Sequence, residues 1–217
     1  MAKTQSMTIK PVIVFDFDGT LVDTFTLALT IFNHVTRRGP MPDEDISRLR
    51  GLSARELMSE LHVHFWQIPL LGFRTRRLIA KRLNSIELIP GIEDTVRELS
   101  KRYHLFILTS NTASNVRNVL QRFGIADQFV GIYGSAGILH KEHSLRRLLA
   151  QNQLKPANVW YVGDEARDVE AAHHVGMPVV AVSWGFNNIA ALERHHPDKL
   201  VFSPDELVEH FGKIYES

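Results

Sequence analysis

Five short apolar segments along the chain have the pattern of buried β-strands. They hold four to six residues each and are rich in β-branched or aromatic side chains, as strands covered on both faces are. These segments are Val12–Phe17, Leu105–Thr109, Phe129–Tyr133, Val159–Val162 and Val179–Val182, with a possible edge strand near Leu200. Stretches with helical spacing separate the later segments. This alternation predicts an α/β fold with a doubly wound, three-layer, Rossmann-like core around a parallel sheet.

Between residues 21 and 89 the pattern of apolar positions changes. This part of the chain has no convincing strand and shows helical spacing in four stretches, 25–39, 44–51, 53–66 and 73–84. The alternation of strand and helix resumes at Pro90 and Gly91. We therefore predict a helical cap domain at 21–89, inserted after the first strand, and a catalytic core formed by 1–20 and 90–217.

Composition narrows the class of protein. The 217 residues are 44% hydrophobic and 23% charged with a net charge of +1, so nothing global indicates a nucleic-acid or membrane partner. The absence of cysteine excludes disulfides, thiolate catalysis and thiolate metal sites. No apolar run approaches the ~20 residues that span a bilayer, and the N-terminus lacks a signal-peptide core. We expect a cytoplasmic protein that is a monomer or a homodimer.

Polar residues follow the predicted strands where the strands end. Asp16 and Asp18 lie at the end of the first strand, Ser110 and Asp164 come after the second and the fourth, and Lys141 begins the helix after the third. Because ligands bind beyond the carboxyl ends of parallel strands, we expect these side chains to converge on one rim of the sheet. Adjacent carboxylates are costly to desolvate unless a cation lies against them, and Mg²⁺ together with Lys141 would provide that charge.

Such a rim suits phosphoryl transfer. Asp16 and Asp164 can jointly hold Mg²⁺, which takes oxygen ligands from one or two carboxylates and from substrate phosphate. One carboxylate can attack phosphorus to form an aspartyl-phosphate, and a second one can protonate the leaving oxygen and later deprotonate water. Lys141 and the Ser110 hydroxyl can bind phosphate oxygens and offset their negative charge.

Four motifs in the order found here are shared with a known family. The chain resembles the haloacid dehalogenase-like hydrolase superfamily through "DFDGT" at 16–20, "LTSN" at 108–111, Lys141 and "GDEARD" at 163–168. The match covers essentially the whole chain and is closest to the phosphatase branch with a helical cap after the first strand, among phosphoglycolate-phosphatase-like enzymes. The resemblance implies an Mg²⁺-dependent phosphatase that hydrolyses a small phosphorylated metabolite through an aspartyl-phosphate intermediate.

The resemblance also implies a role for each matched residue. Asp16 would be the nucleophile and Asp18 the general acid and base, and Asp164 would bind the metal together with Asp16 and the backbone carbonyl of Asp18. Asp168 would support this set directly or through water. The residues around the phosphate would be Gly19, Thr20, Ser110, Asn111 and Lys141.

The predicted cap contains a candidate specificity segment. Related caps place a substrate-specificity loop near "LRGLSARE" at 49–56, where Arg50 and Arg55 would favour an anionic tail on the substrate. For most of the arginines between 48 and 82, we favour a solvated helix face over a role in binding substrate.

Other interpretations stay open for the site and for the function. Asp16 and Asp18 can cap a turn or helix, and Asp164 can be a favourable charge in the first turn of a helix. A phosphosugar mutase would use the same aspartyl-phosphate chemistry and return the phosphoryl group to its sugar. A non-catalytic binding module on the same fold is a third possibility, although such modules often lose a catalytic aspartate that this chain keeps.

Overall fold

The computed structural model describes residues 10–25, 27, 30, 33, 39, 42–52, 56, 59, 60, 86–134 and 141–216. Within this part of the chain, six parallel strands form one sheet in the order β3-β2-β1-β4-β5-β6. The strands are β1 (Val12–Phe15), β2 (His104–Thr109), β3 (Phe129–Gly134), β4 (Val159–Gly163), β5 (Val179–Val182) and β6 (Lys199–Val201). The predicted parallel α/β sheet is therefore confirmed, together with its edge strand near Leu200.

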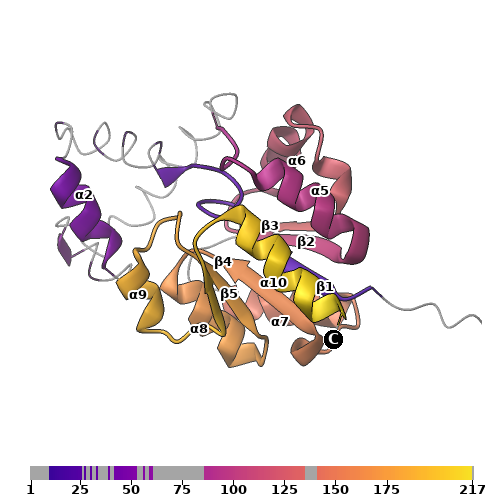
Figure 1. The fold of residues 1–217 in the computed structure, drawn as a ribbon. Coiled ribbons are helices and arrows are strands. Elements are labelled where there is room, and N and C mark those ends of the chain that lie inside the picture. The colour runs from indigo at the N-terminus through magenta and orange to yellow at the C-terminus, as the bar shows by residue number, and fades with distance from the viewer. Residues whose placement is uncertain are drawn as a thin grey trace, which may run out of the picture.

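Helices follow the strands in the predicted alternation (Figure 1). Those of the described residues are α2 (Asp43–Arg50), α5 (Ile92–Arg102), α6 (Ala113–Arg122), α7 (Lys141–Gln151), α8 (Ala166–Val175), α9 (Ile189–Glu193) and α10 (Pro204–Glu216), with short 3-10 turns η3 (Ala126–Gln128) and η4 (Pro156–Asn158). None of these helices combines the length and the hydropathy needed to cross a membrane.

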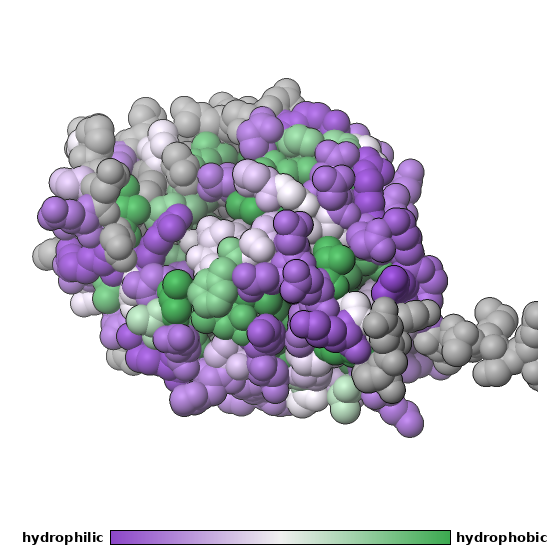
Figure 2. Space-filling view, viewed as in Figure 1, coloured by the Kyte–Doolittle hydropathy of each residue, from purple (hydrophilic) through white to green (hydrophobic). Residues whose placement is uncertain are grey.

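The core consists of two apolar layers, one on each face of the sheet. Successive side chains of a strand point to opposite faces, so Ile13 and Phe15 of β1 pack with α5, α6 and α10, whereas Val12 and Val14 pack with α7, α8 and α9. Both faces of the inner strands β1, β2, β4 and β5 are thus buried, which is why these strands are continuous apolar runs in the sequence. Figure 2 shows that hydrophilic side chains cover much of one face of the molecule, with smaller hydrophobic patches between them.

The first strand is shorter than predicted. We expected it to run to Phe17, but β1 ends at Phe15 because the next residues enter a turn. The Phe17 amide donates to Asp16 Oδ1 at 2.7 Å, and the Phe17 carbonyl accepts from the amides of Leu21 and Val22. The turn places Asp16 and Asp18 beyond the carboxyl end of the strand.

Two connections join the core to the predicted cap, and they lie side by side. Val22 and Leu88 form an antiparallel bridge, and the Asp23 amide donates to the Glu87 carbonyl at 3.0 Å. The predicted helix at 44–51 is present as α2, whereas those at 25–39, 53–66 and 73–84 lie largely outside the described residues. The boundaries 1–20, 21–89 and 90–217 remain a prediction.

Candidate active site

The strand order places the topological switch point of the sheet at β1. From β1 the chain first fills the sheet in one direction with β2 and β3, and then in the other with β4, β5 and β6. Ligands of open α/β sheets bind at such a switch point, beyond the carboxyl ends of the strands. Asp16 directly follows β1 and Asp164 directly follows β4, and the Asp16 amide donates to the Val162 carbonyl at 2.8 Å. Sheet topology alone therefore brings these two carboxylates together.

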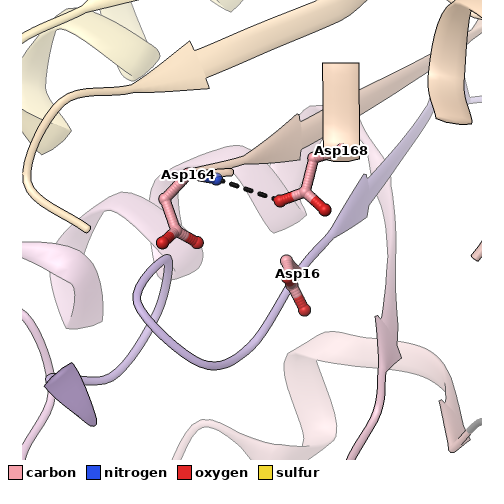
Figure 3. Close-up of side chains that lie close together, drawn as sticks. All are labelled: Asp16, Asp164 and Asp168. Carbon is pink, nitrogen blue, oxygen red and sulfur yellow. Dashed lines mark hydrogen bonds between the residues drawn. The ribbon is translucent and has the colours of Figure 1, made fainter. Parts of the chain in front are cut away.

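Three buried carboxylates meet at this point (Figure 3). Oxygen atoms of Asp16, Asp164 and Asp168 all lie within 4.8 Å of one another, and the three residues are 4%, 0% and 0% exposed. Lys141, the first residue of α7, bridges two of them: its Nζ donates to Asp16 Oδ2 at 2.6 Å and also to Asp168 Oδ1. The predicted convergence of Asp16, Lys141 and Asp164 on one rim is thus present in the fold.

Burial of this cluster changes the protonation equilibria of its members. Desolvation raises the pKa of Asp16 from 3.8 to about 7, although attraction to Lys141 acts in the opposite direction. Desolvation and the carboxylates of Glu165, Asp168 and Asp16 raise the pKa of Asp164 well above its ordinary value. For Lys141, desolvation disfavours the ammonium form, but Asp16 and Asp168 outweigh it and the pKa of this amine is raised. Lys141 is therefore a cation beside carboxyl groups whose pKa values are raised.

Asp164 is held by neutral donors from two separate loops. The Thr20 hydroxyl donates to Asp164 Oδ1 at 2.7 Å, and the Phe186 amide donates to Oδ2 at 2.7 Å. Gly19 lies against the same carboxylate at φ +82°, and a Cβ there would fall 2.3 Å from Asp164 Oδ2. Only glycine both adopts this φ readily and leaves room for the carboxylate. The turn after β1 is therefore shaped to fit Asp164.

Asp168 organises the loop that carries Asp164. Its Oδ2 accepts from the Asp164 amide at 3.2 Å (Figure 3). The same oxygen accepts from the Glu165 amide at 3.2 Å, while Oδ1 accepts from Lys141. These two amides are unpaired donors at the start of α8, and an acceptor side chain in the first turn satisfies them. Asp168 thus connects the start of α8 to Lys141 of α7.

The residues after β2 approach the site from its other side. Thr109 Oγ1 lies 3.5 Å from Asp18 Oδ2 and accepts from the Asn111 amide at 3.0 Å. Ser110 lies between these two residues and is partly buried, and the Asn111 side chain accepts from the Thr112 amide at 2.9 Å. Burial raises the pKa of Asp18, which favours its protonated form. Asp18 is therefore linked to β2 through the Thr109 hydroxyl.

Arg50 belongs to α2 but lies close to the Asp164 loop. Its guanidinium carbon is 4.0 Å above the centre of the Phe25 ring, and Phe25 packs edge-on against Phe186 with ring centres 5.3 Å apart. Phe186 is the residue whose amide donates to Asp164. A chain of ring contacts thus leads from Arg50 to the acidic cluster, whereas Arg55 lies outside the described residues.

The donor set fits a hard divalent cation. Asp16 and Asp164 offer carboxylate oxygens, which are the ligands that Mg²⁺ prefers. The pKa of each is raised because negative charge is concentrated where water is excluded, and a cation would relieve this. Asp168 accepts three hydrogen bonds, from Lys141 and from two amides, whereas the side chains of Asp16 and Asp164 accept two each. Asp16 and Asp164 therefore keep more lone pairs for a cation and are better suited as direct ligands.

One part of the site was not predicted from the sequence. The loop 183–188 between β5 and α9 contributes the Phe186 amide, and Trp184 Nε1 donates to the Thr20 carbonyl at 3.1 Å. Gly185 lies so close that a Cβ there would fall 2.2 Å from Asp164. These contributions are a backbone amide, an indole and the lack of a side chain, none of which marks a site in a sequence.

Comparisons with known proteins place the chain in a family. A family model described as haloacid dehalogenase-like hydrolase matches residues 13–182. A phosphoglycolate phosphatase of Synechococcus elongatus is 39% identical over 201 residues, covering 91% of this chain and 95% of that protein. Another phosphoglycolate phosphatase, from Vibrio vulnificus, is 26% identical over 214 residues, covering 91% of this chain and 94% of that protein.

Solved structures agree with this assignment. A haloacid dehalogenase-like hydrolase from Streptococcus pneumoniae superposes with a TM-score of 0.78 at 29% identity, covering 94% of this chain and all of that one. The chain belongs to the haloacid dehalogenase-like hydrolase family, and its relatives place it in the phosphatase branch, as the four motifs predicted.

Proposed function

We propose that this protein is an Mg²⁺-dependent phosphatase that hydrolyses a small phosphate monoester through an aspartyl-phosphate on Asp16. The observation that carries the proposal is the buried set of Asp16, Asp164 and Asp168, bridged by Lys141 at the switch point of the sheet. A capping or turn role alone would not require three desolvated carboxylates within 4.8 Å of one another. The family and the named phosphatase relatives support the same reaction class.

Each residue has a defined part in the proposed reaction. A carboxylate oxygen of Asp16 attacks phosphorus while the bond from phosphorus to the leaving oxygen breaks, and Asp18 gives its proton to that oxygen. Asp18 then takes a proton from water, which attacks phosphorus and releases phosphate and the Asp16 carboxylate. When bound to Asp16, Asp164 and the Asp18 carbonyl, Mg²⁺ would neutralise charge on the phosphate. The raised pKa of Asp18 supports its role as the acid of the first step.

Around the phosphate, we assign binding roles to the ends of three elements. Lys141 would bind phosphate oxygens while holding Asp16, and Ser110 and Asn111 after β2 would donate to the same oxygens. Gly19 and Thr20 would complete the pocket after β1, where the Thr20 hydroxyl already donates to Asp164. The proposal further includes the helical cap at 21–89, a cytoplasmic location and a monomer or homodimer.

We further propose that the substrate carries an anionic tail, which Arg50 binds. Phosphoglycolate, the compound in the names of the relatives from Synechococcus and Vibrio, is a phosphate monoester with a carboxylate. Arg50 carries a positive charge, lies over Phe25 and has a buried Nε without a hydrogen-bond partner among the described residues. A guanidinium in this position can pair with a carboxylate through two parallel hydrogen bonds.

Phosphate release from a panel of phosphorylated metabolites, with and without Mg²⁺, tests this proposal. We expect release only with Mg²⁺, and faster release from phosphoglycolate than from esters with a neutral tail. Arg50→Ala should reduce the preference for phosphoglycolate. Turnover of an aryl phosphate, whose aryl group carries no charge, should remain largely unchanged. A mutase would release little phosphate from its own substrate, and absence of release from every compound in the panel would exclude the phosphatase.

A further inference from the structure

The loop 183–188 connects the acidic cluster with the end of α2. On one side, the Phe186 amide donates to Asp164 Oδ2, and the Asn187 amide donates to the Asp164 carbonyl at 3.3 Å. On the other side, the Asn188 amide donates to the Arg50 carbonyl at 2.9 Å. In Figure 1, α2 lies on the same side of the molecule as α9, which follows this loop. One short loop thus contacts both the proposed metal ligand and the predicted cap.

Asn187 makes the central contacts of this loop. The residue is 9% exposed, and its Oδ1 accepts from the Ala166 amide at 2.8 Å in the first turn of α8. Its Nδ2 donates to the carbonyls of Arg50 at 3.0 Å and Leu52 at 3.2 Å. A carboxamide has one oxygen acceptor and two N–H donors, so both donors and the acceptor are engaged. Glutamine is the only other side chain with one carboxamide oxygen and two N–H donors, and it is one methylene group longer.

These contacts satisfy the free end of α2. The last carbonyls of a helix lack partners within the helix, and a buried carbonyl without a partner is costly. Here three successive carbonyls accept from the core: Arg50 from Asn187 and Asn188, Gly51 from the Arg194 guanidinium at 2.9 Å, and Leu52 from Asn187. The end of α2 is therefore bound to the core through its backbone, whatever side chains the segment carries.

We propose that Asn187 is a positioning residue that fastens the end of α2 to the first turn of α8. By holding the Arg50 carbonyl, it fixes the place of the Arg50 side chain over Phe25, next to Phe186 and the Asp164 loop. The hydrogen bonds of the Asn187 side chain go to Ala166, Arg50 and Leu52, and only the backbone amide of Asn187 bonds to Asp164. The side chain therefore acts through the segment that it holds. Its effect on kinetics rests on the proposed function, whereas its effect on docking of the segment does not.

Two substitutions distinguish the acceptor Oδ1 of Asn187, which binds α8, from the donor Nδ2, which binds the end of α2. Asn187→Asp keeps an acceptor for the Ala166 amide, at a helix N-terminus where negative charge is favourable, but replaces the donors by an oxygen that faces two carbonyls. Asn187→Ala removes both the acceptor and the donor. If the residue only capped α8, the aspartate variant would behave like wild type. If it fastens α2, both variants should be impaired, and the aspartate variant at least as much as the alanine variant.

Hydrogen exchange and kinetics give independent readouts. We expect the protection factor of the residue-188 amide, the donor to Arg50, to fall about tenfold in both variants because two hydrogen bonds beside it are lost. For phosphoglycolate with Mg²⁺, KM should rise about tenfold while kcat changes less than about threefold, because Arg50 is displaced rather than the reacting groups. For an aryl phosphate without an anionic tail, KM should change less than about threefold.

Asn188→Ala is the matched control. The Asn188 side chain accepts from the Ala191 amide at the start of α9, and its loss leaves the backbone donor to Arg50 in place. We expect wild-type protection and KM in this variant. Arg194→Ala, which removes the donor to Gly51 at the surface, should lower protection in the same direction but less, and it serves if Asn187→Ala does not fold.

The outcomes are separable. Wild-type protection and wild-type KM in Asn187→Asp would overturn the proposal. If protection falls in the Asn187 variants but the wild-type protein releases no phosphate from any substrate, the role of Asn187 in holding α2 stands and the phosphatase proposal is excluded.

Discussion

Asp16 is both buried and paired with a cation. It is 4% exposed, it lies directly after β1, and Lys141 Nζ is 2.6 Å from its Oδ2. Burial raises its pKa to about 7, while Lys141 and a bound cation favour its charged form. A carboxylate held in this way keeps a desolvated oxygen available for attack on phosphorus.

Asp16→Asn is expected to abolish Mg²⁺-dependent hydrolysis of an aryl phosphate. The amide cannot act as the nucleophile, so we expect kcat to fall by about 10³-fold or more, measured by continuous release of the phenolate. Because asparagine has the same shape, the circular dichroism spectrum should not change. Asp23→Asn, which alters an exposed carboxylate shortly after the same turn, should keep wild-type turnover. Turnover near wild type in Asp16→Asn would remove Asp16 from the role of nucleophile.

At the scale of elements, strands were easier to predict than loops. The five segments expected as strands agree with β1 to β5 to within one residue at each end, except at the end of β1. Short apolar runs rich in β-branched residues indicate buried strands, which is why the agreement is close. Asp16, Asp164 and Lys141 could be located because each lies at the end of a strand or the start of a helix. The loop 183–188 could not be identified from the sequence as part of the site, since it acts through backbone amides and through Gly185. Asn187 could not be distinguished from an ordinary loop asparagine.

Asp168 provides a test at the scale of α8. Asp168→Ala removes the acceptor for two amides at the start of the helix and leaves Lys141 with one partner fewer. We expect the free energy of unfolding in urea to fall by about 3 kcal/mol, because a buried ion pair and its hydrogen bonds are broken. Asp168→Asn retains an acceptor for the amides and should lose less.

The comparison for this prediction is another helix start. Asp94 is exposed in the first turn of α5, where the helix dipole favours its charge, so Asp94→Ala should cost about 0.5 kcal/mol. Equal losses in Asp94→Ala and Asp168→Ala would mean that Asp168 acts merely as a first-turn charge.

For the whole molecule, the acidic cluster couples stability to pH. The pKa of Asp16 is raised from 3.8 to about 7 in the folded protein, and those of Asp18 and Asp164 are raised as well. Between these values the folded state binds more protons than the unfolded state, so stability is lost as the pH rises through this window. Without Mg²⁺, we expect the free energy of unfolding to fall by on the order of a few kcal/mol between about pH 4 and about pH 8.

Mg²⁺ should reverse this trend, because it binds the deprotonated carboxylates of the folded state. Stabilisation by a saturating concentration should be larger at about pH 8 than at about pH 5.5, where protons compete for the same oxygens. Urea unfolding at both pH values, with and without Mg²⁺, measures the effect, and Ca²⁺-free buffers avoid a competing cation. The double variant Asp16→Asn, Asp164→Asn removes two of the titrating groups and should be nearly insensitive to Mg²⁺ at either pH. Equal stabilisation of wild type by Mg²⁺ at the two pH values would show that the cation binds elsewhere than at these carboxylates, since only a site that must lose protons gains affinity as the pH rises.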